Sequence, residues 1–416
     1  MGVVHVIAEA NRCLECRRPL CQEGCPIHTP IPQMMHMLKE GKRREAGEML
    51  FANNPLSVVC SLVCDHEKQC EGHCIQGRKG QPIHISSVEN YISDSCLDAL
   101  DGKIPQWNGR RIACIGAGPA GITIALEMAR RGYKVTVFDS KDKIGGILRY
   151  GIPDFRLPKT ILERYGKKLK EWGIMVRPNT TIGGALDISD LFRDGYQAIF
   201  IGTGVWRPKK LGIKGESLGN VHFAMDYLVN PDSYDLGDNV AVIGAGNTAM
   251  DVARTLLRKG THNVTVYARR NVIRATGDEY EYAKLDGTNF VTGKQIMRLT
   301  ERGPIFADSV FDEDGRVIGT EPGSEKLYPS DSVILATSQG PKSKLVNTTD
   351  GLKASAAGLL LTDENGQTTC PGIYAAGDVV LGARTVVEAA AYAKKVAVAM
   401  DEYVQSLPPV EDDDLI

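Results

Sequence analysis

The pattern of apolar and polar positions changes once along the chain, near residue 110. Before that point, apolar residues recur at helical spacing in short segments such as IPQMMHMLKEG, which has Pro32 near its start and Gly41 at its end. This spacing and these end residues predict a helix. Two more helices are expected, one in KRREAGEMLFANNP and one from about Ile85 to Leu100. The first 105 residues are therefore predicted to be helical.

Beyond residue 110, short apolar strands alternate with glycine turns and helices. RRIACIGAGPAGITIALEMARRGYKVTVFDS predicts strand, glycine turn, helix and strand, and residues 238–270 repeat the same unit. Two such βαβ units predict two dinucleotide-binding domains. Further apolar strands are expected at 196–204, 331–340 and 372–380, followed by a long alanine-rich helix. The simplest topology inserts the second domain into the first.

The predicted fold class is therefore α/β, with a helical N-terminal domain followed by two Rossmann-like domains. We expect the helical domain at residues 1–105. The outer dinucleotide-binding domain is expected at 106–232 and 338–416, and the inserted one at 233–337.

Composition narrows the functional classes. Hydrophobic residues make up 43% of the 416 positions and charged residues 24%, as in globular proteins. The net charge of −2 gives no reason to expect nucleic acid or an anionic membrane surface as a partner. No apolar run has the length needed to span a bilayer, and the N-terminus lacks the pattern of a signal peptide.

Eleven cysteines are distributed very unevenly. Eight lie before residue 75, and none lies between 115 and 369. A secreted disulfide framework would not normally crowd one end of a long chain without a signal peptide. We therefore expect a cytoplasmic protein whose crowded cysteines are metal ligands.

The first glycine loop, GAGPAG, follows an apolar strand and opens a helix. Gly116 permits the tight turn, Gly118 lets the backbone approach a pyrophosphate, and Gly121 lets the helix pack on the strand. Asp139 ends the next strand, where a carboxylate can accept hydrogen bonds from a ribose. A dinucleotide site is favoured over a βαβ unit that binds nothing.

The second glycine loop, Gly244-Ala-Gly246-Asn-Thr-Ala, ends in alanine instead of glycine. No acid ends its second strand, and Arg269 and Arg270 stand there instead. Fixed cations at that position suit the 2′-phosphate of NADP(H), which a carboxylate would repel. The alternative is a pair of arginines on a solvated loop.

A third segment, AAGD at 375–378, also follows a predicted strand. Asp378 is placed to accept a hydrogen bond from the ribityl chain of a flavin. The helix after it begins near Thr385 and Val386, whose N–H groups could stabilise negative charge on a reduced flavin ring.

The cysteines form two groups with different spacings. CLECRRPLCQEGCP has the pattern C-x2-C-x4-C-x3-C, and residues 60–74 have C-x3-C-x5-C-x3-C. Zinc sites usually use C-x2-C or C-x4-C pairs. Eight thiols beside a flavin site favour two [4Fe–4S] clusters, which pass single electrons from a two-electron donor. Zinc and free structural thiols remain alternatives.

Four segments together closely resemble the glutamate synthase small-subunit family: CLECRRPLCQEGCP, NNPLSVVCSLVCDHEKQCEGHC, GGILRYGIPDFRLPK and VIGAGNTAMDVART. That family includes the N-terminal half of dihydropyrimidine dehydrogenase and the large subunit of the electron-bifurcating ferredoxin:NADP transhydrogenase. The resemblance covers nearly the whole chain. It implies FAD in the outer domain and NADP(H) in the inserted one.

The resemblance also implies how the cluster ligands are shared. It assigns the first cluster to Cys13, Cys16, Cys21 and Cys74, and the second to Cys25, Cys64, Cys70 and Glu89. Asn90 replaces Glu89 if the alignment slips by one residue, and Glu89 could also be a surface helix residue. Cys60 is then a spare thiol beside the second cluster.

The chain departs from the family pattern at two places. Arg274 stands where the family usually has the proline of a Met-Pro pair, which weakens the NADP assignment, and Ser338 replaces a usual glycine. The lack of cysteines from 115 to 369 also argues against a redox disulfide of the kind found in thioredoxin reductase or glutathione reductase.

We expect an electron-transfer oxidoreductase that moves hydride from NADPH to FAD and single electrons through two [4Fe–4S] clusters to a larger catalytic or electron-accepting subunit of the glutamate synthase type. The alternatives are a transhydrogenase subunit, a dihydropyrimidine dehydrogenase input subunit, or a non-catalytic Fe–S binding module. The expected FAD contacts are Gly116, Gly118, Ala120, Gly121, Asp139, Gly146, Thr203, Gly204, Gly377, Asp378, Thr385 and Val386. The expected NADP contacts are Gly244, Gly246, Asn247, Thr248, Arg269 and Arg270.

Overall fold

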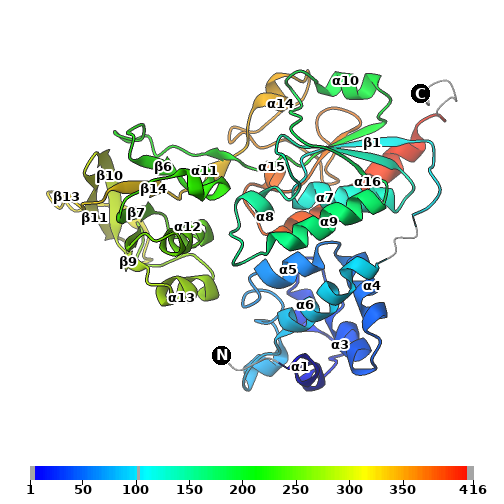
Figure 1. Ribbon diagram of the computed structural model, residues 1–416, viewed down its shortest axis with the longest axis horizontal. Coiled ribbons are helices and arrows are strands. Elements are labelled where there is room, and N and C mark those ends of the chain that lie inside the picture. The colour runs from blue at the N-terminus through cyan, green and yellow to red at the C-terminus, as the bar shows by residue number, and fades with distance from the viewer. Residues whose placement is uncertain (1–4, 101–103, 410–416) are drawn as a thin grey trace. The chain divides into compact units, whose positions relative to one another are not determined.

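The computed structural model describes residues 5–100 and 104–409 (Figure 1). The chain separates into two compact units. The first contains residues up to 149, 154–205 and those from 340 onward, and the second contains 150–153 and 206–339. The N-terminal helices belong to the same unit as the outer sheet, so the division into three domains stays a prediction.

The N-terminal part of the first unit is a bundle of short helices. They are α1 (Val6–Arg12), α2 (Leu20–Glu23), α3 (Ile31–Lys39), α4 (Arg43–Asn53), α5 (Ser57–Val63), η1 (Ile75–Arg78), α6 (Ile85–Cys96) and η2 (Leu97–Ala99). Helix α6 packs against α1, α3, α4 and α5. Its apolar residues Val88 and Ile92 are fully buried in one core with Met34 and Met35 of α3.

The rest of the first unit is built on a five-stranded parallel sheet in the order β16-β4-β1-β2-β3. Its strands are β1 (Arg111–Ile115), β2 (Lys134–Phe138), β3 (Met175–Arg177), β4 (Ala198–Ile201) and β16 (Ile373–Ala375). Because β16 pairs with β4 although the whole second unit separates them in sequence, the outer sheet is completed by the last part of the chain. This arrangement confirms the predicted insertion.

Helices of different lengths accompany this sheet. They are α7 (Pro119–Ala129), α8 (Ile147–Tyr150), α9 (Lys159–Glu171), α10 (Ile188–Arg193), α14 (Lys344–Asn347), α15 (Asp378–Leu381) and α16 (Val386–Ser406). Figure 1 shows α7 and α16 side by side, and the two helices pack against each other. The 21-residue α16 is the expected alanine-rich helix, and its alanines allow the close approach to α7.

The second unit has its own five-stranded parallel sheet, in the order β6-β14-β7-β8-β9. Its strands are β6 (Val221–Phe223), β7 (Asn239–Ile243), β8 (Asn263–Tyr267), β9 (Asn289–Val291) and β14 (Ser332–Leu335). Its helices are α11 (Ala224–Val229), η3 (Pro231–Ser233), α12 (Asn247–Arg258) and α13 (Gly277–Leu285).

An antiparallel sheet that the sequence pattern did not predict completes the second unit. It consists of β10 (Lys294–Thr300), β11 (Gly303–Phe311), β12 (Val317–Thr320) and β13 (Lys326–Leu327). Short strands β5 (Arg207–Pro208) and β15 (Gln339–Gly340) lie in the two connecting segments. Among the described residues, no helix has the length and apolarity to cross a bilayer.

Within the first unit, hydrogen bonds fix the helical bundle to the outer-sheet part. The Tyr165 hydroxyl of α9 donates a hydrogen bond to the Pro55 carbonyl at 2.7 Å. The Lys394 ammonium of α16 donates to the carbonyls of Ala52 and Asn53 at 2.9 and 2.6 Å, where a cation favourably meets the C-terminus of α4. The start of α5 therefore lies against the outer-sheet part.

Candidate functional site

The first glycine loop adopts a conformation that only glycine permits. Gly116 follows β1 with φ +105°, and a Cβ there would lie 2.6 Å from the Gly202 carbonyl oxygen. A Cβ on Gly121 would lie 1.9 Å from the Gly116 carbonyl oxygen, which is impossible without moving the backbone. Gly118 is the N-cap of α7, so the helix N-terminus opens directly onto the loop. The loop fits the pyrophosphate of a dinucleotide.

Asp139 lies directly after β2, beside this loop. Its carboxylate accepts hydrogen bonds from the N–H groups of Ala117 at 2.6 Å and Lys141 at 2.8 Å. Burial raises the pKa of Asp139, although both backbone bonds act in the opposite direction. The carboxylate thus holds the glycine loop in place, with lone pairs remaining for a ribose.

The other predicted FAD residues gather at the same carboxyl edge of the outer sheet. Gly146 has φ +52°, and a Cβ there would lie 2.8 Å from the Gly118 Cα atom. Gly377 has φ +77°, and its Cβ would lie 3.2 Å from the Cβ atom of Ala120. Thr203 and Gly204 follow β4 at this edge. Ligands of open α/β sheets bind at such edges.

The N-terminus of α16 is closed by a capping box. Thr385 is the N-cap: its N–H donates to the Glu388 carboxylate at 2.9 Å, and its side chain accepts from the Glu388 N–H at 3.3 Å. The amide of Thr385 is therefore occupied, and Val386 offers the first amide without an intrahelical acceptor. Asp378 accepts from the Arg384 N–H at 3.1 Å, and burial raises its pKa to about 6.

The second glycine loop is held by its neighbours on both sides. A Cβ on Gly244 would lie 2.2 Å from the Ala336 carbonyl oxygen, whereas nothing lies within 4 Å of a Cβ on Gly246. Asn247, the first residue of α12 and directly before Thr248, accepts a hydrogen bond from the Thr276 N–H at 2.9 Å. The space at Gly246 is where a pyrophosphate would approach the backbone.

Three arginines lie in the segment that follows β8, next to this loop. Arg269 and Arg270 follow β8, and the Arg274 N–H donates to the carbonyl of Ala245 in the loop at 2.8 Å. Arg269 and Arg274 are exposed and Arg270 is half-buried. Within the described residues, none of the three side chains has a hydrogen-bonding or ion-pair partner. Arg274, which weakened the NADP assignment, thus adds a third cation beside the loop.

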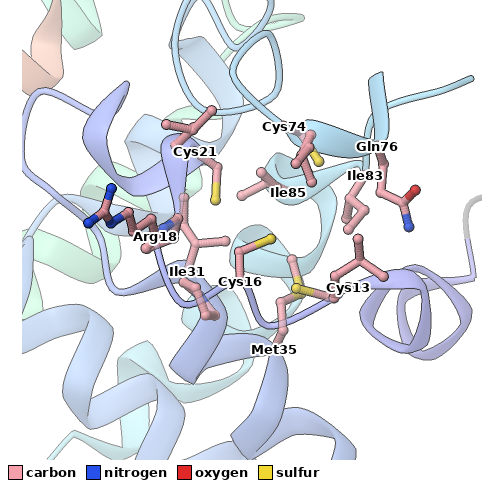
Figure 2. Close-up of a pocket in the computed structure, with 15 residues that line it drawn as sticks. Cys13, Cys16, Arg18, Cys21, Ile31, Met35, Cys74, Gln76, Ile83 and Ile85 are labelled. Carbon is pink, nitrogen blue, oxygen red and sulfur yellow. The ribbon is translucent and has the colours of Figure 1, made fainter. Parts of the chain in front are cut away.

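The first four predicted cluster ligands line one pocket. Figure 2 shows Cys13, Cys16, Cys21 and Cys74 around it, with apolar walls. Burial, and then the nearby charge of Cys74 with smaller contributions from Cys13 and Cys16, raises the pKa of Cys21 to about 11. The apolar side chains of the walls are Ile31, Met35, Ile83 and Ile85. Four thiols in an apolar pocket require a cationic centre before all can be thiolates.

Local structure explains why these cysteines converge. Cys13 follows α1 as its C-cap, and Cys74 precedes η1 as its N-cap. Glu15, between Cys13 and Cys16, has φ +48°, and its carboxylate accepts from the Lys39 ammonium at 2.7 Å. The same ammonium donates to the Cys13 carbonyl at 3.2 Å. Helix α3 therefore fixes the loop that carries the first two thiols.

The second predicted set lies deeper. Burial, followed by the negative charges of Glu89, Glu71 and Cys25, raises the pKa of Cys70. A hydrogen bond with Cys60 and then burial raise the pKa of Cys64, on which Glu89 and Cys70 also act. Cys25, Cys60, Cys70 and Glu89 are all buried. Cys25, Cys64, Cys70 and Glu89 therefore lie near enough to act on one another electrostatically, with Cys60 as an additional thiol, and their role as cluster ligands stays a prediction.

Glu89 is not a surface helix residue. Its side chain lies on α6 and is 6% exposed, and its Oε1 accepts a hydrogen bond from the Ser57 hydroxyl of α5 at 2.8 Å. Burial raises the pKa of Glu89 to about 7, and the Ser57 bond acts in the opposite direction. Asn90 is half-buried and donates to the Ser61 hydroxyl at 3.1 Å. Of the two, Glu89 is the one beside the cysteines.

The donor set formed by Cys13, Cys16, Cys21 and Cys74 fits an iron–sulfur cluster. Among the described residues, no group of three or more His, Cys, Asp or Glu side chains is arranged to hold a single metal ion. Four thiols around a wider pocket match the four-cysteine donor set of a [4Fe–4S] cluster.

Sequence reasoning missed the side chains that support the second set. Ser57 binds Glu89, the Thr29 hydroxyl lies 3.4 Å from the Cys25 sulfur, and His66 Nδ1 lies 3.5 Å from the Cys70 sulfur. One signal was available: Ser57, Ser61 and Cys64 recur at helical spacing and so share a face of an otherwise apolar helix.

Two protein family models match successive parts of the chain, the outer-sheet and inserted parts on one side and the helical bundle on the other. Residues 110–397 match the family model of pyridine nucleotide-disulphide oxidoreductases. Residues 3–99 match the model of dihydropyrimidine dehydrogenase domain II, a 4Fe-4S cluster domain.

Solved structures agree on the fold. FprA from Mycobacterium tuberculosis superposes with a TM-score of 0.62 at 18% identity, over 71% of this chain and 85% of that chain. A 2-naphthoyl-CoA reductase superposes with a TM-score of 0.56 at 19% identity, over 88% of this chain and 52% of that chain.

Curated relatives match over nearly the full length. The glutamate synthase [NADPH] small chain of Halomonas elongata is 34% identical over 92% of this chain and 87% of its own length. That of Escherichia coli is 31% identical over 94% and 89%. The dihydropyrimidine dehydrogenase subunit PreT of Salmonella typhimurium is 30% identical over 96% and 94%. The chain therefore belongs to the pyridine nucleotide-disulphide oxidoreductases and, among them, to the family of the glutamate synthase small chains, as an NAD(P)H-dependent flavin and iron–sulfur oxidoreductase.

Proposed function

We propose that this chain is the electron-input subunit of a glutamate-synthase-type enzyme, with NADPH as electron donor and a larger catalytic subunit as acceptor. FAD bound to the outer sheet would accept hydride from NADPH, and two [4Fe–4S] clusters would carry electrons one at a time. The relatives named as small chains support a larger partner.

The observation that carries this proposal is the difference in depth between the two cysteine sets. Three of the four predicted ligands of the first set are partly exposed, with Cys74 buried, whereas three of the four of the second set are buried, with Cys64 partly exposed. The second set is also the one tied to the flavin-binding part, because α5 contacts α16. Depth and packing thus favour an order from flavin to second set to first set to surface.

The chain's own residues have binding and tuning roles in this proposal. The glycine loops would hold the pyrophosphates, Asp139 a ribose, and Arg269 and Arg270 the 2′-phosphate of NADPH. The N-terminus of α16 would stabilise negative charge on the reduced flavin through the amides from Val386 onward. Glu89 would give the second cluster a harder ligand than cysteine and thereby shift its potential.

Rapid-mixing spectroscopy of the reconstituted protein tests the cofactor assignment. NADPH should bleach the flavin absorbance faster than NADH at equal concentration, and the cluster absorbance should follow. Equal or faster bleaching by NADH would overturn the NADP assignment. Failure of the clusters to be reduced after the flavin would overturn the proposed order, and turnover of an artificial acceptor would exclude a non-catalytic binding module.

A dihydropyrimidine dehydrogenase input subunit is the second candidate. It is favoured by the similarity to PreT, which covers 96% of this chain at 30% identity. Co-purification distinguishes the two functions: a large amidotransferase subunit supports the first and a pyrimidine-reducing subunit the second.

A further inference from the structure

The pocket of the first cysteine set has an exposed apolar rim. Leu14 and Ile75 both line this pocket, and they are 62% and 41% exposed. Exposed apolar side chains that gather beside a pocket often mark a surface that another molecule covers. In the second set, three of the four predicted ligands are buried and Cys64 is partly exposed.

The two segments that form this rim also carry unpaired positive charge. Arg17 and Arg18 follow Cys16, while Arg78 and Lys79 lie at the end of η1, whose Ile75 and Gln76 line the pocket. All four cations are exposed, and within the described part of the chain their side chains have no hydrogen-bonding, ion-pair or aromatic partner.

Nearby acids do not cancel this charge. Glu15 is bound by Lys39 at 2.7 Å and by His36 at 3.1 Å, and Glu9 is bound by Arg12 at 2.8 Å. Glu23 is left as an exposed acid in the segment. Glu71, three residues before Cys74, accepts from the uncharged N–H and hydroxyl of Ser86 at 2.8 and 2.7 Å. Four cations against two acids without a cationic partner stand out on a chain whose net charge is −2.

We propose that this rim, formed by Leu14, Arg17, Arg18, Ile75, Arg78 and Lys79, is the docking surface for the electron-accepting partner, which presents an acidic face around its own redox centre; an acidic ferredoxin carries such a face and serves as the probe. Opposite charge steers such an encounter, and the apolar pair at the centre loses water on contact. Docking there brings the partner next to the partly exposed thiols Cys13, Cys16 and Cys21. The inference rests on the proposed function, since it gives the first cluster a protein partner.

Charge reversal at two positions that do not line the pocket tests the rim. The variant is Arg17→Glu with Arg78→Glu. The matched control is Lys167→Glu with Arg316→Glu, which changes the net charge equally at side chains 73% and 72% exposed elsewhere on the chain. A milder variant, Arg17→Gln with Arg78→Gln, serves if reversal impairs folding or cofactor content.

Binding of an oxidised, acidic [2Fe–2S] ferredoxin to each holoprotein is measured by calorimetry over a range of salt concentrations. The expected result is binding by the wild type that weakens with salt, a loss of about tenfold or more in the reversal variant at low salt, and no change in the control. Equal binding by all variants, or none by the wild type, would overturn the docking surface.

Electron transfer from NADPH separates this inference from the proposed function. The reversal variant should reduce the ferredoxin more slowly and a basic c-type cytochrome faster, with unchanged reduction of a neutral quinone. If NADPH fails to reduce the clusters of the wild type, the proposed function fails, while the binding measurement still decides the docking surface.

Discussion

Ser57 and Glu89 meet in the interior of the helical bundle, and their contact shows how one hydroxyl can orient a candidate ligand. The Ser57 hydroxyl occupies one oxygen of the carboxylate at 2.8 Å, and both residues are buried, at 2% and 6% exposure. The second oxygen remains for a metal. A hydrogen bond from a neighbouring hydroxyl to a metal-binding carboxylate fixes the orientation of the carboxylate and tunes the metal.

Replacing Ser57 by alanine should therefore change the second cluster without removing it. The expected result is a shifted midpoint potential and altered EPR line shape of one cluster, together with a loss of about 1–3 kcal/mol in the unfolding free energy of the apoprotein, because a buried carboxylate oxygen loses its donor. Ser57→Thr should restore the signal.

Ser93→Ala is the matched control, since the Ser93 hydroxyl is equally buried on α6 but donates to the backbone carbonyl of Glu89. An identical change of potential in Ser57→Ala and Ser93→Ala would show that Ser57 acts only through packing.

Cys25 belongs by sequence to the first cysteine run, but it is buried and its charge acts on Cys70 of the second predicted set. Cys25→Ala should accordingly abolish the same EPR signal that Cys64→Ala abolishes, and spare the signal that depends on Cys13. Cys60→Ala, which removes a buried thiol next to Cys64, should retain both clusters. A Cys25 variant that loses the signal dependent on Cys13 would contradict the shared-ligand assignment.

Some of these residues could be predicted from the sequence and others could not. The cysteines were visible because spaced thiols are rare and have few other uses in a long chain without disulfides. Ser57 was not, because its partner Glu89 lies 32 residues away on another helix, and a serine in a helix usually has only a local partner. Contacts between elements depend on packing, which a single sequence does not display.

At the scale of elements, the glycines of the two βαβ turns differ in whether the surrounding backbone leaves space for a side chain. Gly116, Gly121 and Gly244 are required by the protein's own backbone, because a Cβ there would lie within 2.6 Å of a carbonyl oxygen. Gly246 has no neighbour within 4 Å. Its lack of a side chain leaves the space in front of the N-terminus of α12 open.

Gly246→Ala should consequently fold and still lose NADPH. We expect the unfolding free energy to fall by about 1 kcal/mol or less, the cost of a poorer N-cap, while the Kd for NADPH rises about tenfold or more because the methyl group occupies the path of the pyrophosphate. Fluorescence titration with NADPH and thermal unfolding of the same sample measure both effects.

Gly319→Ala provides the control, because Gly319 lies in the same unit on β12 and also has open space around its Cβ position. It should leave both quantities unchanged. Unaltered NADPH binding in Gly246→Ala would show that the pyrophosphate of NADPH does not bind at this loop.

Helices and strands were predicted well where apolar residues recur with a clear period, and poorly elsewhere. Both βαβ units, the alanine-rich α16 and the helix beginning at Ile85 appear at the expected positions. The antiparallel strands β10 to β13 were missed, since KQIMRLT and GPIFADSVF are interrupted by charges and β10 and β11 pair through a register shift between Ile296 and Arg298. Such irregular strands depend on their partners more than on their own pattern.

At the scale of the whole molecule, the chain forms two units, each with its own hydrophobic core. The second unit has its own sheet and its own clusters of buried residues around Val242 and Phe306. The first unit closes its five-stranded sheet with β16 and needs no strand from residues 206–339. The helical bundle, in contrast, belongs to the first unit through Tyr165 and Lys394.

Replacing residues 206–339 by a flexible Gly/Ser linker of about ten residues should therefore separate NADPH oxidation from cluster chemistry. The shortened protein should retain FAD and both EPR signals after reduction by dithionite, because the glycine loop at Gly116 and every predicted cluster ligand lie in the first unit. It should no longer be reduced by NADPH, since Gly244, Gly246 and the arginines that follow β8 are removed.

We compare the shortened and full-length proteins by visible absorbance, EPR and anaerobic titration with NADPH. The control is Gly246→Ala in the full chain, which should lose NADPH binding while the second unit is still present. Reduction of the shortened protein by NADPH would place a nicotinamide site in the first unit. Loss of FAD or of a cluster would show that the second unit supports those sites, because a chain whose units were truly independent would keep both.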